Sequence, residues 1–111
     1  MTESWVPPSC TLPTTELPLR AAEFDAVFAD AVRLVERPSP DRVRLELEPA
    51  AEVAARVADL VVRETACCSF FTFALTATAG ALHLDITVVP GHIEVLDVLA
   101  AQATAAAGVQ A

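Results

Sequence analysis

The sequence contains no lysine, and its seven basic residues are all arginines. Fifteen acidic residues give a formal net charge of −8, which argues against nucleic acids and anionic membrane surfaces as partners, because both are negatively charged. The start of the chain lacks the basic patch and the apolar run of a signal peptide, and no stretch approaches the roughly 18 continuous apolar residues of a membrane span. We therefore expect a cytoplasmic protein.

Cysteine is also scarce, with Cys10, Cys67 and Cys68 as its only examples. Neither paired CxxC motifs nor zinc-finger spacing is present, which disfavours a structural zinc site. Cytoplasmic thiols are normally reduced, and a disulfide between Cys67 and Cys68 is disfavoured because adjacent Cα atoms lie about 3.8 Å apart whereas a disulfide requires roughly 4.4–6.8 Å. We interpret the three thiols as ligands or reactive groups.

The chain divides into an N-terminal arm and one domain. Residues 1–17 contain three prolines and show no periodicity, which predicts an extended arm. Trp5, Val6, Cys10 and Leu12 make this arm apolar enough to lie on the domain or on a partner subunit. Residues 18–111, in a chain of 54% hydrophobic composition, are predicted to form a single α+β domain.

Periodicity predicts three helices and three strands. The first helix is expected from about Leu17 to Glu36, ending before Pro38 and Pro40, with an apolar stripe at helical spacing made of Phe24, Val27, Phe28, Ala31 and Val35. A strand, a helix, two strands and a helix follow, at about residues 42–48, 50–68, 71–78, 82–88 and 93–103.

This α-β-α-β-β-α order predicts a two-layer α+β fold. Each strand has one apolar and one polar face, so we expect a three-stranded sheet with helices on one face only. The last two strands are expected to form a hairpin, and one hypothesis places the third strand between the other two, as in a split βαβ unit. Open sheet edges favour a homodimer.

Glu64 occupies an unusual position in the second predicted helix. On a helical wheel it falls in the middle of an apolar stripe formed by Val53, Val57, Leu60, Val61, Cys67 and Cys68. A separate, solvated face is predicted for Glu52, Arg56, Asp59 and Arg63. Burying an ionised carboxylate alone is costly, so Glu64 must be paired, protonated or bound to a cation.

The end of this helix favours a cation over a nucleophilic thiolate. Cys67 and Cys68 lie in the last turn, where exposed carbonyls make a helix negative, and Glu64 adds a further acidic group. Thiolates select Cu(I) and Zn(II), and by the same softness Hg(II) and As(III). Cys10, carried by the arm, could supply a third sulfur, with Glu64 as fourth ligand or proton acceptor. His83, on the polar strand face, and His92, at a helix start, are not expected to be ligands.

Three segments carry a resemblance to a known family: Cys-Thr-Leu-Pro-Thr at residues 10–14, Pro-Leu-Arg-Ala-Ala-Glu-Phe-Asp at 18–25, and Glu-x-x-Cys-Cys-x-Phe-Phe-x-Phe at 64–73. The chain resembles small bacterial proteins with a Glu-x-x-Cys-Cys-x-Phe-Phe core, some of which are associated with heavy-metal resistance. The resemblance implies that Cys10, Glu64, Cys67 and Cys68 belong together, and it supplies no activity.

Two classes of function therefore stand at this point. The first is a cytoplasmic protein that binds a soft metal or metalloid (Hg, Cu, As or Zn) through Cys10, Glu64, Cys67 and Cys68. The second is a thiol enzyme using the same residues, either a thiol–disulfide redox protein or a lyase similar to organomercurial lyases, whose residue types match here although their sequence patterns do not. A third alternative is an interaction domain whose open sheet face binds another protein.

Overall fold

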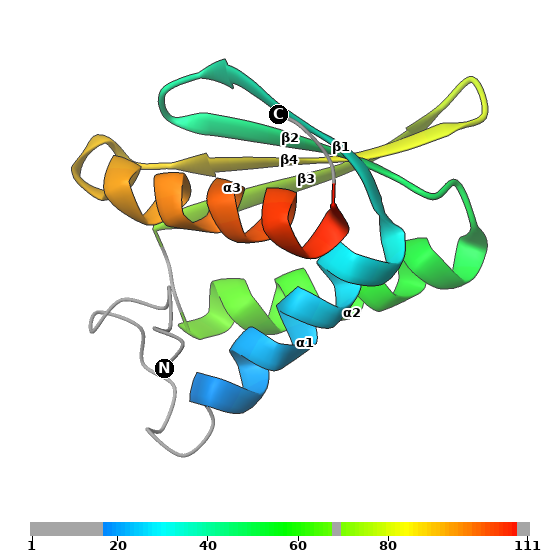
Figure 1. The fold of residues 1–111 in the computed structure, drawn as a ribbon, viewed down its shortest axis with the longest axis horizontal. Helices are drawn as coiled ribbons and strands as arrows, with labels where there is room; N and C mark the ends of the chain where they lie inside the picture. The colour runs from blue at the N-terminus through cyan, green and yellow to red at the C-terminus, as the bar shows by residue number, and fades with distance from the viewer. Residues whose placement is uncertain (1–16, 68–69, 109–111) are drawn as a thin grey trace.

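The computed structural model describes residues 17–67 and 70–108, and it describes the side chains of residues 22–66 and 70–108. A sheet forms one layer and the helices pack against one of its faces (Figure 1). The elements in chain order are α1 (Leu17–Ala31), β1 (Val32–Ser39), β2 (Arg42–Leu47), α2 (Ala51–Cys67), β3 (Phe71–Thr78), β4 (Ala81–Val88), the short 3-10 helix η1 (Pro90–His92) and α3 (Ile93–Ala107). The predicted two-layer α+β class is confirmed. Of the predicted arm, only Leu17, the first residue of α1, lies within the described residues.

The sheet has four strands in the order β1-β2-β4-β3, and all neighbours are antiparallel. β4 lies between β2 and β3, which confirms the split arrangement of the β2-α2-β3 unit, and β3 and β4 form the predicted hairpin. Thr78 pairs with Ala81 across a turn in which Ala79 and Gly80 both have positive φ, at 51° and 77°. That combination is typical of the type I′ turn, whose twist matches that of a hairpin.

The prediction of a first helix reaching Glu36, and of only three strands, is wrong. α1 ends at Ala31, and the chain continues directly as β1, which pairs with β2. Val35 is buried as predicted, but it faces the core from a strand in which it pairs with Leu45. Pro38 fits here because β1 is an edge strand with a register shift between Glu36 and Ser39, where a missing N–H does not interrupt the sheet.

The core lies between the inner face of the sheet and the helices. The inner residues of the strands alternate as the sequence predicts and are nearly inaccessible, among them Val43, Leu45, Leu47, Leu82, Leu84, Ile86 and Val88. The helices contribute Phe24, Val27, Phe28, Val57, Leu60, Leu96 and Leu99 to the same cluster. α3 continues four residues beyond its predicted end at Ala103 to Ala107, and Gly108, at φ 70°, closes it by donating its N–H to the carbonyl of Thr104 at 3.0 Å.

The opposite face of the sheet is polar, and its centre is a buried carboxylate. Asp85 on β4 accepts hydrogen bonds from Arg44 Nε at 2.8 Å and Arg42 Nη2 at 3.1 Å, both from β2. Burial raises the pKa of Asp85, but the hydrogen bonds from the two arginines outweigh it and hold the pKa below its usual value. His83 lies on this polar face as predicted, with Nε2 3.9 Å from Asp85 Oδ2.

Two ion pairs fasten α2 to α1. Arg63 Nη1 lies 3.0 Å from Glu23 Oε2, and Arg56 Nη1 lies 3.2 Å from Asp30 Oδ2. From Arg56 to Arg63 the contact advances two turns along α2, while from Asp30 to Glu23 it goes back two turns along α1. The two helices are therefore antiparallel. The hydrogen bond with Glu23 raises the pKa of Arg63 above its usual value. The face of α2 predicted to be solvated is therefore partly a helix–helix contact, which positions the end of α2.

Candidate functional site

Glu64 lies in the core at the end of α2, with none of its surface exposed. It shares one helical stripe with Val57, Leu60 and Val61, all of which are buried. The helical register predicted from the sequence is therefore confirmed for this part of α2. Such burial is rare for a glutamate, because transfer of an ionised carboxylate from water to an apolar environment is strongly unfavourable without compensation.

The thiols of the predicted site lie outside what the structure describes. Cys67 is the last residue of α2, one turn after Glu64, but its side chain is not among those described. Cys10 and Cys68 lie outside the described residues. The structure therefore places Glu64 and the backbone of Cys67 on one helical turn, and the grouping of all four residues stays a prediction.

The last turn of α2 has a negative electrostatic character. The last turn of the helix contains no basic residue, so nothing within it offsets the partial negative charge of the terminal carbonyls. The last arginine of α2, Arg63, is held by Glu23 on α1 and by Asp59 one turn earlier. A positive ion near Cys67 would be attracted by the carbonyl groups at the end of α2 and by the carboxylate of Glu64.

Three residues separate the end of α2 from the start of β3, and the last of them, Phe70, contacts an imidazole. Phe70, which immediately precedes β3, is buried, and its ring stacks on that of His92 with centroids 4.2 Å apart and planes 7° apart. Backbone hydrogen bonds fix this junction, from Val89 N–H to the carbonyl of Phe70 at 3.3 Å and from His92 N–H to the carbonyl of Val89 at 3.0 Å. The sequence predicts His92 at the start of a helix, and the structure confirms that position. No spacing in the sequence indicates its contact with Phe70.

His92 also has an unused nitrogen. Its Nδ1 atom is buried and has no hydrogen-bond partner among the described residues. The phenylalanines that follow the cysteines form the predicted core, since Phe71 lies 5.3 Å from Phe73, which stacks in turn on Phe24 of α1 at 6.5 Å. The start of β3 therefore joins the aromatic core, and the residue before it, Phe70, carries the imidazole of His92 on its ring.

Within residues 17–67 and 70–108, no group of three or more His, Cys, Asp or Glu side chains is arranged to hold a metal ion. Two of the four predicted ligands, Cys10 and Cys68, fall outside those ranges, as does the side chain of Cys67. The set predicted from the sequence, Cys10, Glu64, Cys67 and Cys68, is therefore the one to test.

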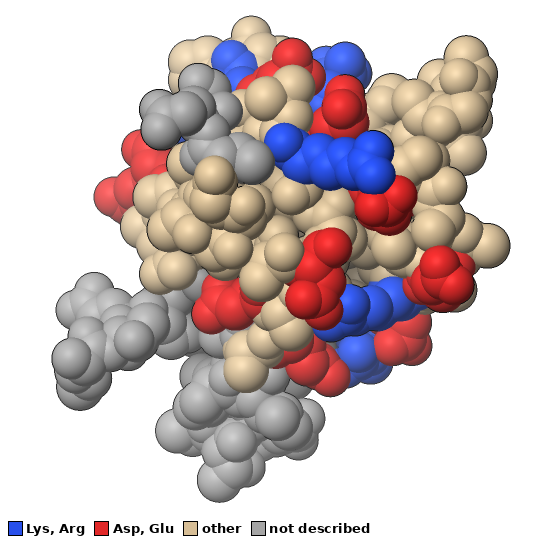
Figure 2. Space-filling view, turned by 45° about the vertical axis from the view of Figure 1, so that its right-hand side comes forward, with Lys and Arg blue, Asp and Glu red and all other residues tan. Residues whose placement is uncertain are grey.

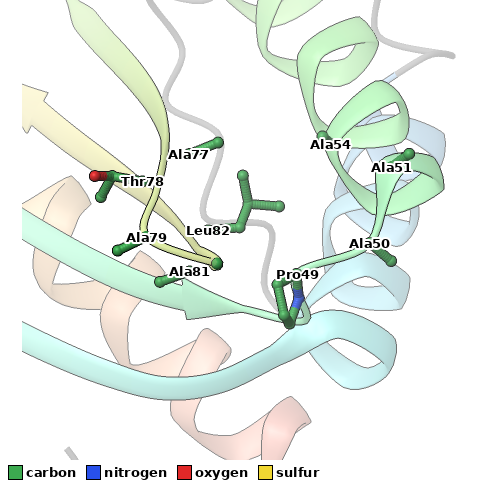
Figure 3. Close-up of a pocket in the computed structure, with 10 residues that line it drawn as sticks. Pro49, Ala50, Ala51, Ala54, Ala77, Thr78, Ala79, Ala81 and Leu82 are labelled. Atoms are coloured by element: carbon green, nitrogen blue, oxygen red, sulfur yellow. The ribbon is translucent and has the colours of Figure 1, made fainter.

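A pocket of about 370 Å³ lies at the other end of α2, between its first turn and the β3–β4 turn (Figure 3). Its lining carries no titratable side chain and consists of small or apolar residues: Pro49, Ala50, Ala51, Ala54, Ala77, Thr78, Ala79, Gly80, Ala81 and Leu82. The lining residues therefore offer no general acid or base.

Among the helices that the structure describes, none has both the length and the apolar character needed to cross a bilayer. Comparison of the chain with protein-family models, with curated proteins and with solved structures gave no match.

Proposed function

We propose that this protein binds one soft metal ion or metalloid per chain, of the group Hg, Cu, As and Zn, through the thiolates of Cys67, Cys68 and Cys10. Glu64 acts in this proposal as a fourth ligand or as the acceptor of a thiol proton. The observation that supports it is the complete burial of Glu64 one turn before Cys67, at a helix end without a basic residue in its last turn.

The burial of Glu64 argues against a purely structural role for this stretch. A packing role would be filled by a leucine or methionine at lower cost, since a carboxylate in the core requires compensation. A bound cation would stabilise the ionised form of Glu64, and it would also offset the negative end of α2. Thiolate sulfurs next to such a carboxylate select soft ions over Mg²⁺ or Ca²⁺, which prefer all-oxygen sites.

His92 extends the proposed site. Its ring lies against Phe70, two residues after Cys68 in the chain, and its Nδ1 is buried without a hydrogen-bond partner among the described residues. Imidazole binds Cu and Zn well, so a nitrogen at this place can serve as a ligand or can accept the proton that a thiol loses on metal binding.

The second candidate function is a thiol enzyme at the same residues. In a lyase acting on an organomercurial, the carbon–mercury bond would break, a proton from a thiol or from Glu64 would pass to the carbon, and Hg(II) would stay on the thiolates. A redox protein would instead pair Cys10 with Cys67 or Cys68. The negative helix end favours the binding function, because activated cysteines normally sit at positive helix N-termini or beside basic groups.

Native mass spectrometry of the reduced full-length chain, titrated separately with Hg(II), Cu(I), Zn(II) and As(III), tests the proposal. We expect one ion per chain, and loss of at least about 100-fold in affinity in the double variant Cys67→Ser/Cys68→Ser, which removes two of the ligands. Equal uptake by the wild type and the double variant would overturn it.

Glu64→Gln separates the carboxylate from the thiols. We expect this variant to fold and to lose about 10- to 100-fold in metal affinity, the usual effect of removing a group that supports the ligands. The matched control is Glu46→Gln, because Glu46 is an exposed glutamate on the outer face of the sheet. Release of benzene from phenylmercury by the wild type, and not by the double cysteine variant, would decide in favour of the lyase.

A further inference from the structure

The two edges of the sheet differ in how they are protected. Among the described strands, β1 forms one edge and β3 the other. β1 carries Arg33, Arg37 and Pro38 and has two register shifts against β2. Charges, proline and irregular pairing are the usual means by which a sheet edge is kept from pairing with another chain. The β1 edge is therefore closed to a further strand.

β3 has none of these features. It contains no proline, glycine or charged residue, and all eight of its residues pair in unbroken register with β4. Within the described part of the chain no strand pairs with its other side. Its inner residues Phe73 and Leu75 are only half-buried, whereas the β4 residues paired with them, Ile86 and Leu84, are 0% and 4% exposed. The core is thus incompletely covered along this edge.

The surface beside β3 is also uncharged. α2 runs antiparallel to β3, because its end connects to the start of β3 and its first turn faces the β3–β4 turn across the pocket (Figure 3). Its ion-pairing residues Arg56 and Arg63 face α1. On the other side of α2 a stripe at helical spacing holds only small or apolar residues, namely Ala51, Ala55, Ala58, Val62 and Thr65.

Val62 is the most exposed large hydrophobic residue of the described chain, at 66%. In Figure 2, which brings forward the side of the molecule where Figure 1 shows the β3–β4 turn, the upper right of the surface carries neither acidic nor basic side chains, whereas both are interspersed over the middle. Elsewhere the described surface is crossed by salt bridges such as Arg33–Glu48 and Arg37–Asp97.

We infer that the outer edge of β3 and the uncharged stripe of α2 bind a second copy of this chain. Two β3 strands pair antiparallel about a two-fold axis and join two sheets of four strands each into one. The half-buried Phe73 and Leu75 then pack against their symmetry mates, and Val62 lies at the rim.

The charge distribution favours a second copy of the chain as the partner. Each chain carries a net charge of −8, so two copies repel when charged surfaces face each other. A two-fold axis places each surface opposite itself, and neither β3 nor the uncharged stripe of α2 contains a charge to oppose. The strand, about 27 Å long at 3.4 Å per residue, and α2, about 25 Å long at 1.5 Å per residue, match in length, so strand and helix contribute along the whole contact.

Sedimentation equilibrium of the full chain, with a thiol reductant and a chelator present, tests the inference independently of metal binding. At roughly 100 μM we expect a mass of twice 11.7 kDa, with a concentration dependence that reflects dimer dissociation. Ala77→Lys and Val62→Lys place a charge on exposed positions of β3 and α2, which a monomer tolerates, and each should give a monomer with unchanged far-ultraviolet circular dichroism. Val98→Lys, at an exposed valine of α3, is the matched control and should stay dimeric.

Two results would overturn the inference. A wild-type chain that is monomeric with β3 amides protected from hydrogen exchange would show that a segment of the same chain covers the edge. A dimer that persists in both Ala77→Lys and Val62→Lys would place the contact on another surface.

Discussion

The ring of His92 lies parallel to that of Phe70, with centroids 4.2 Å apart, although 22 residues separate them in the chain. This stack links Phe70, the residue before β3, to the helical turn η1. A structural role for the ring explains its stacking on Phe70. It does not explain Nδ1, which is buried without a hydrogen-bond partner among the described residues.

The variant His92→Phe separates these two roles. Phenylalanine keeps a flat ring against Phe70, so we expect the melting temperature to change by only a few degrees, as for a shape-conserving replacement. The affinity for Cu(I) or Zn(II), measured by competition with a chromophoric chelator, should fall about 10-fold because the nitrogen is lost. His83→Gln, on the outer face of the sheet, is the control. Unchanged affinity in His92→Phe would restrict the site to the thiols and Glu64.

Asp85 contributes stability that depends on pH. Its pKa is lowered by Arg44 and Arg42 in spite of burial, so its contribution is present above the ordinary carboxyl pKa of 3.8 and is lost as pH falls through the lower value of the folded state. We expect Asp85→Asn to lower the free energy of unfolding by about 1–3 kcal/mol at pH 7, because Arg42 and Arg44 stay charged and lose the carboxylate that pairs with them. Urea unfolding at pH 7 and at about pH 3 should show this difference shrinking in acid. Glu36→Gln, an exposed carboxylate paired across the strands with Arg44, should show little effect at either pH.

The pair between Arg63 and Glu23 should contribute much less. Both side chains are about 40% exposed, and solvent screens their attraction. A double-mutant cycle with Arg63→Ala and Glu23→Ala should therefore give a coupling energy below about 1 kcal/mol, and added salt should reduce it further. A coupling energy well above this, insensitive to salt, would show that the α1–α2 contact is less hydrated than the exposed fractions indicate.

Strand β1 shows why part of the fold could not be predicted. Ala31 and Val35 are four residues apart and both are buried, so a helical stripe fits the sequence through the real end of α1. What decides for a strand is pairing with β2, including Val35 with Leu45, which is a tertiary contact that no local period contains. The other strands alternate clearly between apolar and polar residues, and they were predicted correctly for that reason.

The candidate site divides in the same way. The burial of Glu64 could be predicted, because helical geometry alone places it on the stripe of Val57, Leu60 and Val61. The contacts of Arg56 and Arg63 with α1, and that of His92 with Phe70, depend on how separate elements meet. The periodicity of the sequence predicts which face of a helix or strand a residue occupies. Its contacts with other elements depend on how the helices and the sheet pack together.

Asp25 on α1 is expected to lower the stability of the folded state at neutral pH. Its Oδ1 atom is buried without a hydrogen-bond partner among the described residues, and burial raises the pKa of its carboxyl group. A carboxyl whose pKa is raised on folding contributes stability below its unfolded pKa and loses that contribution as pH rises through the folded value. At neutral pH, Asp25 should therefore weaken the folded state.

We expect Asp25→Asn, which keeps the shape and removes the charge, to raise the free energy of unfolding at pH 7 by about 1 kcal/mol, the lower end of the cost of a buried unsatisfied polar group. The difference from the wild type should vanish near pH 3, where the aspartate is protonated in both states. Urea unfolding at the two pH values measures it, with Glu46→Gln as the exposed control. A variant less stable than the wild type at pH 7 would mean that the ionised carboxylate of Asp25 is stabilised in solution, by a cation or by residues outside the described ranges.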